Sequence, residues 1–458
     1  MKESIFHSVA LLEEVCIGCT ACLQACPTEA IRLREGKARI MENRCIDCGV
    51  CIRTCPVSAK IARTNEMHEL RRFSYNIAVV PPELYSQFGD DVTPEMILRA
   101  ILKLGFDEVF EVAMVSEEIT LATKKYLERK DIKRPVLSFN CPAVVRLITV
   151  RFPDLVDHLL PLKSPMGVAG KRLRESRPAE LGLSSEKVGI FYITPCPARM
   201  TRIRQPMTES EVYYNGAISI ADIYGDILIK LKEVPSESEL DLHKSGGSGI
   251  GWGAIGGESK ALLMEDCMYV DGMVNVLKIF EEIEKGELSK LNYLECMACT
   301  GGCVGGPLMV DNVFIARNKI KKLRQRYEDQ SPIDPEQVIK LYREGRYHHQ
   351  KKLELNLIDP LDSSPVQAIK KMKERKHILD TLPGIDCGAC GAPNCRALAE
   401  DVVQGRAKVT DCIFVLFEQA NEMAQRVADW TARLPSSMKT QHKRRAEPEK
   451  LTLKEVGK

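Results

Sequence analysis

Cysteine spacing constrains this chain more than any other feature of its sequence. Two sets of four cysteines near the N-terminus share the pattern C-x2-C-x2-C-x3-C-P and repeat at an interval of about 29 residues. Between them lies IRLREGKARI, whose alternating apolar and polar residues predict a β-hairpin. The repeat indicates two similar metal-binding halves. The eight cysteines are Cys16, Cys19, Cys22, Cys26, Cys45, Cys48, Cys51 and Cys55.

Three cysteines spaced by two residues can ligate three corners of a 4Fe-4S cluster from one tight loop, and the fourth ligand must come from elsewhere. In the bacterial two-cluster pattern, the last cysteine of each set ligates the other cluster. We therefore assign Cys55 to the first cluster and Cys26 to the second. Structural zinc is the alternative, but zinc would not require eight interleaved cysteines with a proline after each fourth one.

The composition excludes several classes of protein. The chain has 18 cysteines among 458 residues, and its opening, MKESIFHSVALLEEV, lacks the apolar core and cleavage site of an export signal. Such cysteines are expected to bind metal rather than to form disulfides. The 65 lysines and arginines nearly balance 63 acidic residues, which argues against nucleic acid or an anionic membrane as a partner. Because the apolar runs fall short of the ~18 residues of a transmembrane helix, we expect a soluble, cytoplasmic protein.

The region from Arg72 to about Gln330 alternates strand-like runs (NIAVV, RPVLSF, VGIFYI) with helical patterns such as PEMILRAILKLG, which predicts an α/β region with parallel strands. Gly251, Gly253 and Gly256 satisfy G-x-G-x-x-G, but the preceding HKSGGSGI is not a convincing strand. We therefore do not expect a nucleotide site there, and a partner would carry any NAD or flavin.

Four further cysteines lie where a ligand is expected. Two directly follow RPVLSF and VGIFYI, at the carboxyl ends of parallel strands, where open α/β sheets place their ligands. Two more lie in LECMACTGGCVGGP, whose glycines suit a tight loop around a large group. We expect these four to hold one cluster, which leaves Cys267 and Cys296 as ordinary thiols. The four are Cys141, Cys196, Cys299 and Cys303.

A third cysteine set follows the polar connector around DPLDSSP. It has the spacing C-x2-C-x4-C-x16-C, and GIDCGACGAPNC places glycines beside the ligands, where the backbone must approach a cluster closely. We expect a 4Fe-4S cluster, with zinc held by four thiolates as the alternative. The ligands would be Cys387, Cys390, Cys395 and Cys412.

Apolar residues step by three and four positions from Ile413 to Leu434, which is the period of a coiled-coil seam. The preferred interpretation is an amphipathic helix packed on its own cysteine module, and self-association is the alternative. The remaining residues, 434–458, mix charges without an apolar period and are expected to form a flexible tail.

The three central cysteine loops resemble the signatures of the iron-only (FeFe) hydrogenases. LECMACTGGCVGG is similar to the third signature of that family, in which Cys299 would bind a 4Fe-4S cubane and Cys303 would bridge it to a diiron subsite. Cys141 and Cys196 match the cubane ligands of the first two signatures. The segments IAVVPPEL, with Pro81, and LLPLKSPMGVAGK, with Ser164, are similar to segments that line the catalytic domain. The resemblance implies an H-cluster, a cubane joined to a diiron centre with carbon monoxide, cyanide and an amine-containing dithiolate.

The chain departs from the family pattern where protons should move. Asn140 stands where fast enzymes have a relay cysteine, and a carboxamide has no accessible deprotonated state with which to pass a net proton. Leu160 stands where the family has a serine, and the acidic residues expected on the preceding helix are absent from TLATKKYLERK. Either protons use another route or turnover is slow.

Other substitutions surround the expected cofactor. Thr194 replaces a methionine, and Arg199 replaces the lysine that holds a cyanide, whereas Met297 keeps its place in the third signature. A planar guanidinium should change the hydrogen-bond geometry and the cofactor potential. A solvent-facing charge is the alternative for Arg199. These departures resemble the sensory branch of the family, which lacks the proton-relay cysteine.

The expected fold is an α/β catalytic domain with parallel sheets, preceded by an α+β two-cluster ferredoxin-like domain and followed by a small, mostly helical iron-sulfur module. The expected divisions are 1–71, 72–331, a connector at 332–372, the module at 373–433 and the tail at 434–458. The expected activity is slow, reversible H2 oxidation and proton reduction that serves H2 or redox sensing. A high-turnover subunit of an electron-transfer complex and a non-enzymatic iron-sulfur assembly or carrier protein are the alternatives.

The resemblance also implies partners. H2 and protons would be the substrates, a ferredoxin-like or other redox protein would exchange electrons, and dedicated maturation proteins would insert the diiron subsite. A signalling partner, or a second copy of the chain, would bind through the 413–434 helix.

Overall fold

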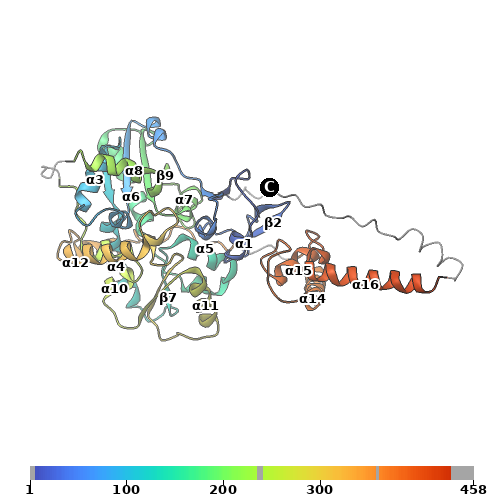
Figure 1. The fold of residues 1–458 in the computed structure, drawn as a ribbon. Coiled ribbons are helices and arrows are strands. Elements are labelled where there is room, and N and C mark those ends of the chain that lie inside the picture. The colour runs from blue at the N-terminus through green and yellow to red at the C-terminus, as the bar shows by residue number, and fades with distance from the viewer. Residues whose placement is uncertain (1–5, 235–240, 357–360, 435–458) are drawn as a thin grey trace, which may run out of the picture. The chain divides into compact units, whose positions relative to one another are not determined.

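The computed structural model describes residues 6–234, 241–356 and 361–434, and the chain forms two compact units, Met1–Asp359 and Pro360–Lys458 (Figure 1). The predicted tail, apart from Leu434, lies outside the described residues. None of the described helices combines the length and apolar content that a bilayer crossing requires. Parallel sheets and flanking helices confirm the expected fold class.

The N-terminal region consists of two similar halves, as its repeat predicts. β1 (Val9–Leu11) pairs antiparallel with β4 (Lys60–Ala62), which brings the ends of the region together. β2 (Ile31–Arg34) and β3 (Lys37–Ile40) form the hairpin expected between the cysteine sets. Two short helices, α1 (Ala21–Gln24) and α2 (Val50–Thr54), begin within the two cysteine loops.

Two parallel sheets form the centre of the first unit. The larger has the strand order β6-β5-β8-β9, and the smaller has the order β10-β11-β7. Their neighbouring strands all run parallel, so the carboxyl ends within each sheet lie at one edge. The strands are β5 (Tyr75–Val80), β6 (Glu108–Glu111), β7 (Val136–Leu137), β8 (Val188–Thr194), β9 (Gly216–Ser219), β10 (Cys267–Asp271) and β11 (Tyr293–Met297).

Helices cover the sheets and connect their strands. All residues of β8 and β11 are buried, which explains the apolar run VGIFYI of β8, whereas β11 also buries Glu295. The helices of this part are α3 (Pro94–Leu102), α4 (Val112–Leu127), α5 (Pro142–Arg151), α6 (Pro165–Leu181), α7 (Pro197–Arg204), α8 (Ile220–Leu231), α9 (Gly247–Gly251), α10 (Gly257–Leu262), α11 (Met273–Glu284) and α12 (Val313–Arg326).

The G-x-G-x-x-G segment lies between two helices rather than after a strand. Gly251 ends α9, and Gly256 immediately precedes α10. The strand–turn–helix setting of a dinucleotide site is therefore missing from this segment.

Part of the expected connector packs into the first unit. It contains α13 (Pro335–Arg343), whose Val338 is buried, and Tyr347 is also buried. The Tyr347 hydroxyl donates to Glu118 over 2.8 Å, and the backbone N–H of Lys163 donates to the Tyr347 carbonyl over 2.8 Å. These contacts hold residues 335–347 against the rest of the first unit.

The second unit consists of α14 (Pro365–Thr381), α15 (Cys395–Val403) and α16 (Ile413–Ala432), and α16 extends away from the other two (Figure 1). Val415 is buried, but apolar positions farther along are open to solvent, including Met423 and Trp430, whose exposed fractions are 68% and 69%. The expectation that this helix packs along its length on its own module is therefore wrong. Val415, near the start of α16, belongs to the apolar cluster of the module, so the module packs against the first turn of this helix.

Candidate metal centre

Three loops from the carboxyl ends of parallel strands bring four cysteines together. Cys141 follows β7 and precedes α5, and Cys196 follows β8 and precedes α7. Cys299 and Cys303 follow β11. All four side chains line one cavity, whose walls also include Arg199, Met297 and Cys48. The strand-end argument therefore places these cysteines around a common space.

The chemistry of the four thiols fits an iron-sulfur cluster. Burial raises the pKa of Cys196 to about 11 and raises the pKa of Cys299 and Cys303 as well, and the thiols raise one another's pKa further. Four bare thiolates would therefore be unfavourable in this dry space, and a bound cationic cluster would compensate their charge. Cys141, Cys196, Cys299 and Cys303 are the residues that would hold it.

Glycines allow the third loop to pass close to its neighbours. Gly302 has a φ of 85°, and a Cβ atom there would lie 2.4 Å from the backbone nitrogen of Ile255. A Cβ atom on Gly306 would lie 2.4 Å from the carbonyl oxygen of Pro195. Larger residues would push the loop away from the strand end that carries Cys196.

A buried ion pair lies beside Cys303. Nη2 of Arg199 is 3.1 Å from Sγ of Cys303, and its Nη1 is 2.6 Å from Oε1 of Glu83. Arg199 also donates to the Tyr192 hydroxyl. Arg199 is 6% exposed and Glu83 is 1% exposed, so the solvent-facing alternative for this arginine is wrong. Burial raises the pKa of Glu83 despite its arginine partner.

The N-terminal cysteines divide as the interleaved pattern predicts. Three residues of the first set and the last residue of the second line a shared cavity, and they are Cys16, Cys19, Cys22 and Cys55. Burial raises the pKa of Cys45, Cys48 and Cys51, and the charge of Cys26 raises it further, so Cys26 lies close to the second set. Each group has the four thiols that a 4Fe-4S cluster requires.

The second of these groups adjoins the central cavity. Cys48 lines that cavity together with Cys141 and Cys196. Arg53, at the end of the same loop, donates to the carbonyl of Gly305 in the third central loop. The N-terminal region therefore contacts the loop that contains Cys299 and Cys303.

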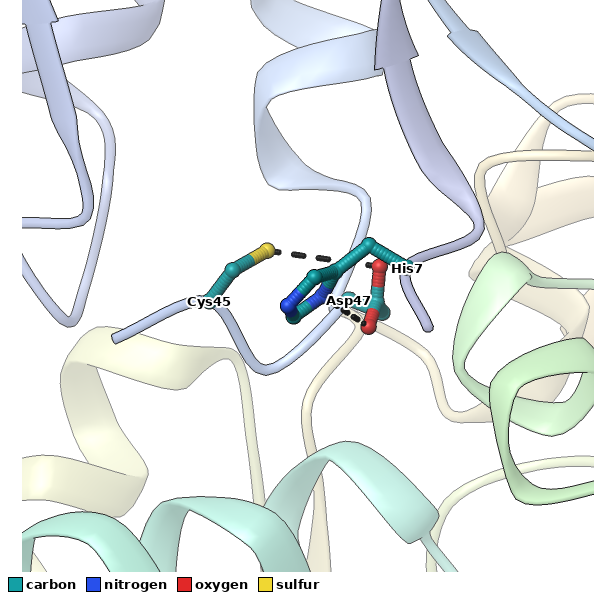
Figure 2. Close-up of side chains that lie close together, drawn as sticks. All are labelled: His7, Cys45 and Asp47. Carbon is teal, nitrogen blue, oxygen red and sulfur yellow. Dashed lines mark hydrogen bonds and ion pairs between the residues drawn. The ribbon is translucent and has the colours of Figure 1, made fainter. Parts of the chain in front are cut away.

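Asp47 connects this group to α5 of the sheet region. Its carboxylate lies 2.9 Å from Nδ1 of His7 and 3.0 Å from Nη1 of Arg146 on α5. His7, Cys45 and Asp47 lie close together (Figure 2), with their possible ligand atoms within 4.8 Å of one another. Because Arg146 occupies the carboxylate and Cys45 belongs to a cysteine set, we interpret Asp47 as an ionic link between the regions.

The C-terminal set has a more open environment. Cys387 is exposed, Cys390 and Cys395 are half-buried, and Cys412 is buried. Burial raises the pKa of Cys390, and the charges of Cys412 and Cys387 raise it further, which indicates that these thiols are close. Gly388 and Gly391 have φ values of 75° and 78°, so the glycines beside the ligands form tight left-handed turns.

Comparison with protein families identifies the central region. Residues 74–268 and 263–307, together about half of the chain, match the model of the iron only hydrogenase large subunit, C-terminal domain. The chain belongs to the iron-only hydrogenase family. Residues 15–59 match a 4Fe-4S dicluster domain, and residues 382–414 match a putative Fe-S cluster family. The chain is therefore a hydrogenase-type iron-sulfur protein.

The curated relatives include hydrogenases and assembly factors. Iron hydrogenase 1 of Clostridium pasteurianum is 25% identical over 308 residues, covering 57% of this chain and 53% of that protein. The NADP-reducing hydrogenase subunit HndD of Solidesulfovibrio fructosivorans is 24% identical over 347 residues, covering 65% and 56%. The chain spans about half the length of these two relatives. A cytosolic Fe-S cluster assembly factor NAR1 homolog of Schizosaccharomyces japonicus is 25% identical over 133 residues, covering 27% and 25%.

A solved structure shares the hydrogenase fold. A variant of [FeFe]-hydrogenase HydA1 from Chlamydomonas reinhardtii matches with a TM-score of 0.50 and 15% sequence identity. The match covers 64% of this chain and 98% of that chain. Because identity is low, this likeness supports the fold and carries no assignment of activity.

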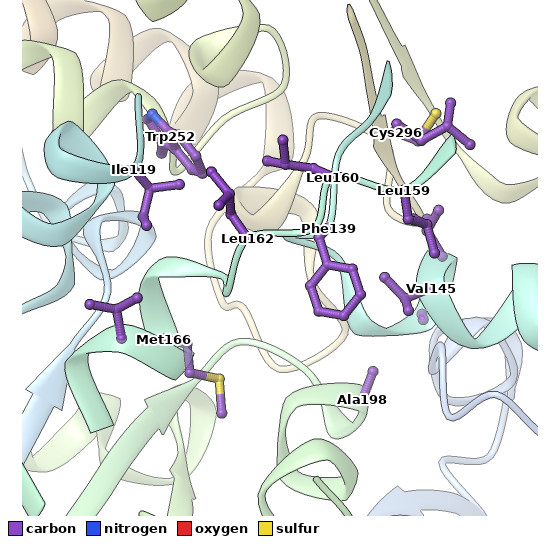
Figure 3. Packing of buried hydrophobic residues seen from close by; sticks show 14 of the residues in the cluster. Ile119, Phe139, Val145, Leu159, Leu160, Leu162, Met166, Ala198, Trp252 and Cys296 are labelled. Atoms are coloured by element: carbon purple, nitrogen blue, oxygen red, sulfur yellow. The ribbon is translucent and has the colours of Figure 1, made fainter. Parts of the chain in front are cut away.

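The positions that sequence analysis compared with the family's proton relay are apolar or neutral in this chain. Leu160 is 2% exposed and lies among Phe139, Leu159 and Leu162 (Figure 3). Asn140 is half-buried, and its backbone N–H donates to Oγ of Ser138 over 3.2 Å. Neither Asn140 nor Leu160 is among the residues that line the cysteine cavity.

The acidic residues on α4 are engaged elsewhere. Glu118 pairs with Arg172 over 2.6 Å and accepts from the Tyr347 hydroxyl. Glu117 accepts from the backbone of Gly246 and from Ser331. These contacts leave no acidic side chain of α4 bonded to Asn140 or Leu160.

The other expected cofactor residues have different positions. Met297 lines the cavity, whereas Thr194 is fully buried and donates to the Cys196 carbonyl over 2.8 Å. Pro81 immediately precedes the short helix Pro82–Gln87 that contains Glu83. Ser164 accepts from the backbone N–H of Gly167 and thereby caps α6. Pro81, Thr194 and Ser164 are thus adjacent to the site rather than part of the cavity wall.

Sequence reasoning missed several residues near the site. Nothing in the sequence indicated that Glu83 pairs with Arg199, although Glu83 lies in the segment IAVVPPEL. The ring of His349, in the expected connector, contacts that of Phe139 in a tilted arrangement with centroids 4.3 Å apart, and its Nε2 lies 3.3 Å from the Leu160 carbonyl oxygen. Such contacts between distant segments have no sequence period that could reveal them.

Proposed function

We propose that this protein is an FeFe hydrogenase that holds an H-cluster at Cys141, Cys196, Cys299 and Cys303. The observation that carries the proposal is the convergence of these thiols on one cavity, with Arg199 and Met297 in the same wall. When bound, the H-cluster would supply a metal site and an amine for reversible H2 oxidation and proton reduction. The protein's own part would be to bind, orient and enclose this group.

Arg199 would orient the group beside Cys303. Its guanidinium already contacts Sγ of Cys303, and Glu83 and Tyr192 hold the opposite side of the fork. A fixed planar donor next to a bridging thiolate would hydrogen-bond an anionic ligand and tune the cluster potential. Glu83 would be a positioning residue, because it holds the guanidinium of Arg199 in place and does not itself contact the bound group.

We infer slow turnover and a role in H2 or redox sensing. The inference rests on Asn140 and Leu160, because neither side chain can pass a net proton along the family's route. Replacing Asn140 with cysteine in matured protein should raise the rate of proton-coupled turnover. An unchanged rate would contradict a broken relay, and a wild-type rate equal to that of ordinary hydrogenases would instead favour a high-turnover catalytic subunit.

Infrared spectroscopy tests the cofactor directly. The full chain, produced together with hydrogenase maturation proteins, should show cyanide and carbonyl stretching bands, and Cys303→Ser should lose them. Cys267→Ser is the matched control, because Cys267 lies outside every proposed cysteine group. Intact iron-sulfur absorption without these bands would favour an assembly or carrier protein, which the partial similarity to NAR1 homologs also supports.

The accessory sites complete the proposal. Two 4Fe-4S clusters would occupy the N-terminal region and one the C-terminal module, and electrons would pass to a ferredoxin-like or other redox partner. Signalling or homodimerisation through the 413–434 helix and a cytoplasmic location stay predictions. Iron and sulfide analysis of the full chain should give four 4Fe-4S units, including the cubane, if every cysteine group is occupied.

A further inference from the structure

Two glutamates lie near each other beside β11, because the backbone N–H groups that bond to Glu295 belong to Gly256 and Ser259, on either side of Glu258. Glu295 lies on β11 and is 0% exposed, and Glu258 lies at the start of α10 and is 2% exposed. Burial raises the pKa of both carboxyls, and the charge of Glu295 raises that of Glu258 further. Two carboxylates in such an environment do not both ionise readily, so they titrate as a pair.

Only neutral donors hydrogen-bond to the pair. Oγ of Ser138 donates to Glu258 over 2.8 Å, and the Tyr293 hydroxyl donates to the same carboxylate. Glu295 accepts from the backbone N–H groups of Gly256 and Ser259, over 2.9 and 2.8 Å. These bonds fix the position of both carboxyl groups without neutralising them.

No cation among the described residues forms an ion pair with either glutamate. Lys260 on α10 lowers the pKa of Glu295 weakly, but its ammonium lies 5.6 Å above the ring of Tyr269. Burial alone lowers the pKa of Lys124 on the neighbouring α4, so that lysine does not pair with the glutamates. The pair therefore needs a bound proton to avoid two uncompensated charges.

The pair lies close to the first cysteine loop. Ser138, which donates to Glu258, accepts from the backbone N–H of Asn140, the residue before Cys141. Burial raises the pKa of the Cys296 thiol, and the negative charges of Glu295, Cys141 and Glu258 raise it further. The electrostatic field of charge at Cys141 and the field of charge on the two glutamates therefore both reach Cys296.

A short segment separates the pair from water. The backbone N–H of Ser259 donates to Glu295. The next residue, Lys260, is exposed, and Leu263 after α10 is 82% exposed. The end of α10 thus reaches the surface within a few residues of the two carboxyls.

We propose that Glu258 and Glu295 take up one proton from solvent when the cluster at Cys141 receives one electron. In this step a low-potential one-electron donor reduces the cluster, water supplies the proton, and a pair that held one proton then holds two. The buried region gains no net charge. The proposal rests on the cubane part of the proposed function and does not require the diiron subsite.

The test measures the midpoint potential of this cluster at several pH values. We would use the full chain with its iron-sulfur clusters assembled but without maturation proteins, and would identify the signal as the one that Cys196→Ser removes. The wild-type potential should fall as pH rises through the titration of the pair, and Glu258→Gln should lose this dependence. Glu117→Gln, which alters another buried carboxyl, should keep it.

Two further measurements protect the test against a folding defect in Glu258→Gln. Tyr293→Phe keeps both carboxyls but removes a hydrogen bond to Glu258, so the pH-dependent interval should move to higher pH. Infrared difference spectra should show a protonated carboxyl band that grows on reduction in the wild type. A pH-independent wild-type potential, or equal pH dependence in wild type and Glu258→Gln, would overturn the proposal, whereas missing cyanide and carbonyl bands would overturn only the hydrogenase assignment.

Discussion

The central cysteine group and the C-terminal group each offer four thiols, but their surroundings differ. The central ligands come from three distant segments that two parallel sheets position, and a large apolar core surrounds them. The C-terminal ligands all come from one segment, Cys387 to Cys412. The apolar core around them includes the small residues Ala392, Ala397 and Ala399. The fold of the first unit therefore positions the central cysteines by itself. For the C-terminal module, we expect that folding depends on the bound cluster.

Removal of iron should separate the two regions most strongly. The C-terminal unit should lose its structure, because metal binding that is coupled to folding contributes on the order of 10 kcal/mol in small domains. The sheets of the first unit should stay folded. Hydrogen exchange of the chelated full chain would measure both units at once, and equal protection of α15 and β8 would contradict the comparison.

Loss of the buried ion pair should have the next largest effect. Glu83→Ala leaves Arg199 buried and unpaired, so we expect a decrease of about 3 to 5 kcal/mol in the free energy of unfolding of the first unit. Chemical denaturation followed by tryptophan fluorescence of Trp252 would report it, with Trp430 replaced by phenylalanine. Glu128→Ala, which breaks an exposed pair with Lys125, is the control and should cost about 1 kcal/mol or less. A similar cost for both variants would mean that burial does not strengthen the Arg199 pair.

Acid should weaken the first unit through Glu209. Burial tends to raise the pKa of this carboxyl, but the charge and hydrogen bond of Arg202 outweigh burial and lower it to about 2. Because this pKa lies below the ordinary value of 4.5, the pair stabilises the fold above that pH, and the contribution is lost as pH falls toward 2. The loss should amount to about 3 kcal/mol.

Glu209→Gln provides the control for this acid effect. Its unfolding free energy should be lower than that of the wild type at neutral pH, and the difference should shrink as pH falls. Thermal unfolding between about pH 6 and pH 3 would measure both curves. Parallel curves for the two proteins would show that Glu209 does not cause the acid sensitivity.

The smallest effect is expected on α16. Met423→Glu places a charge where the side chain is already exposed, so the stability of the second unit should change by about 0.5 kcal/mol or less. Sedimentation equilibrium of the same variant tests self-association. A wild-type dimer that Met423→Glu dissociates would show that a second copy covers this helix face, and a monomeric wild type would exclude it.

Local sequence patterns predicted the cysteine ligands well, but they did not predict the residues that surround these ligands. Fixed spacing identified the cysteine sets, and strand ends correctly brought Cys141 and Cys196 to one cavity, because both signals lie within a few residues. Other features depend on tertiary packing: the pairing of Glu83 with Arg199, the ring contact of His349 with Phe139, and the nearness of Glu258 to Glu295. The apolar period of α16 predicted a helix correctly but did not show that its face would stay uncovered by its own module.

Cys48 forms part of the wall around the central cavity, so two of the proposed inorganic centres would be neighbours with little protein between them. Electron tunnelling weakens steeply with distance, and this hop would therefore be fast compared with breaking H2 or carrying protons. Substitutions along this wall would alter both centres together. The accessory cluster would then do more than conduct electrons over a distance. It would store an electron directly beside the reactive centre.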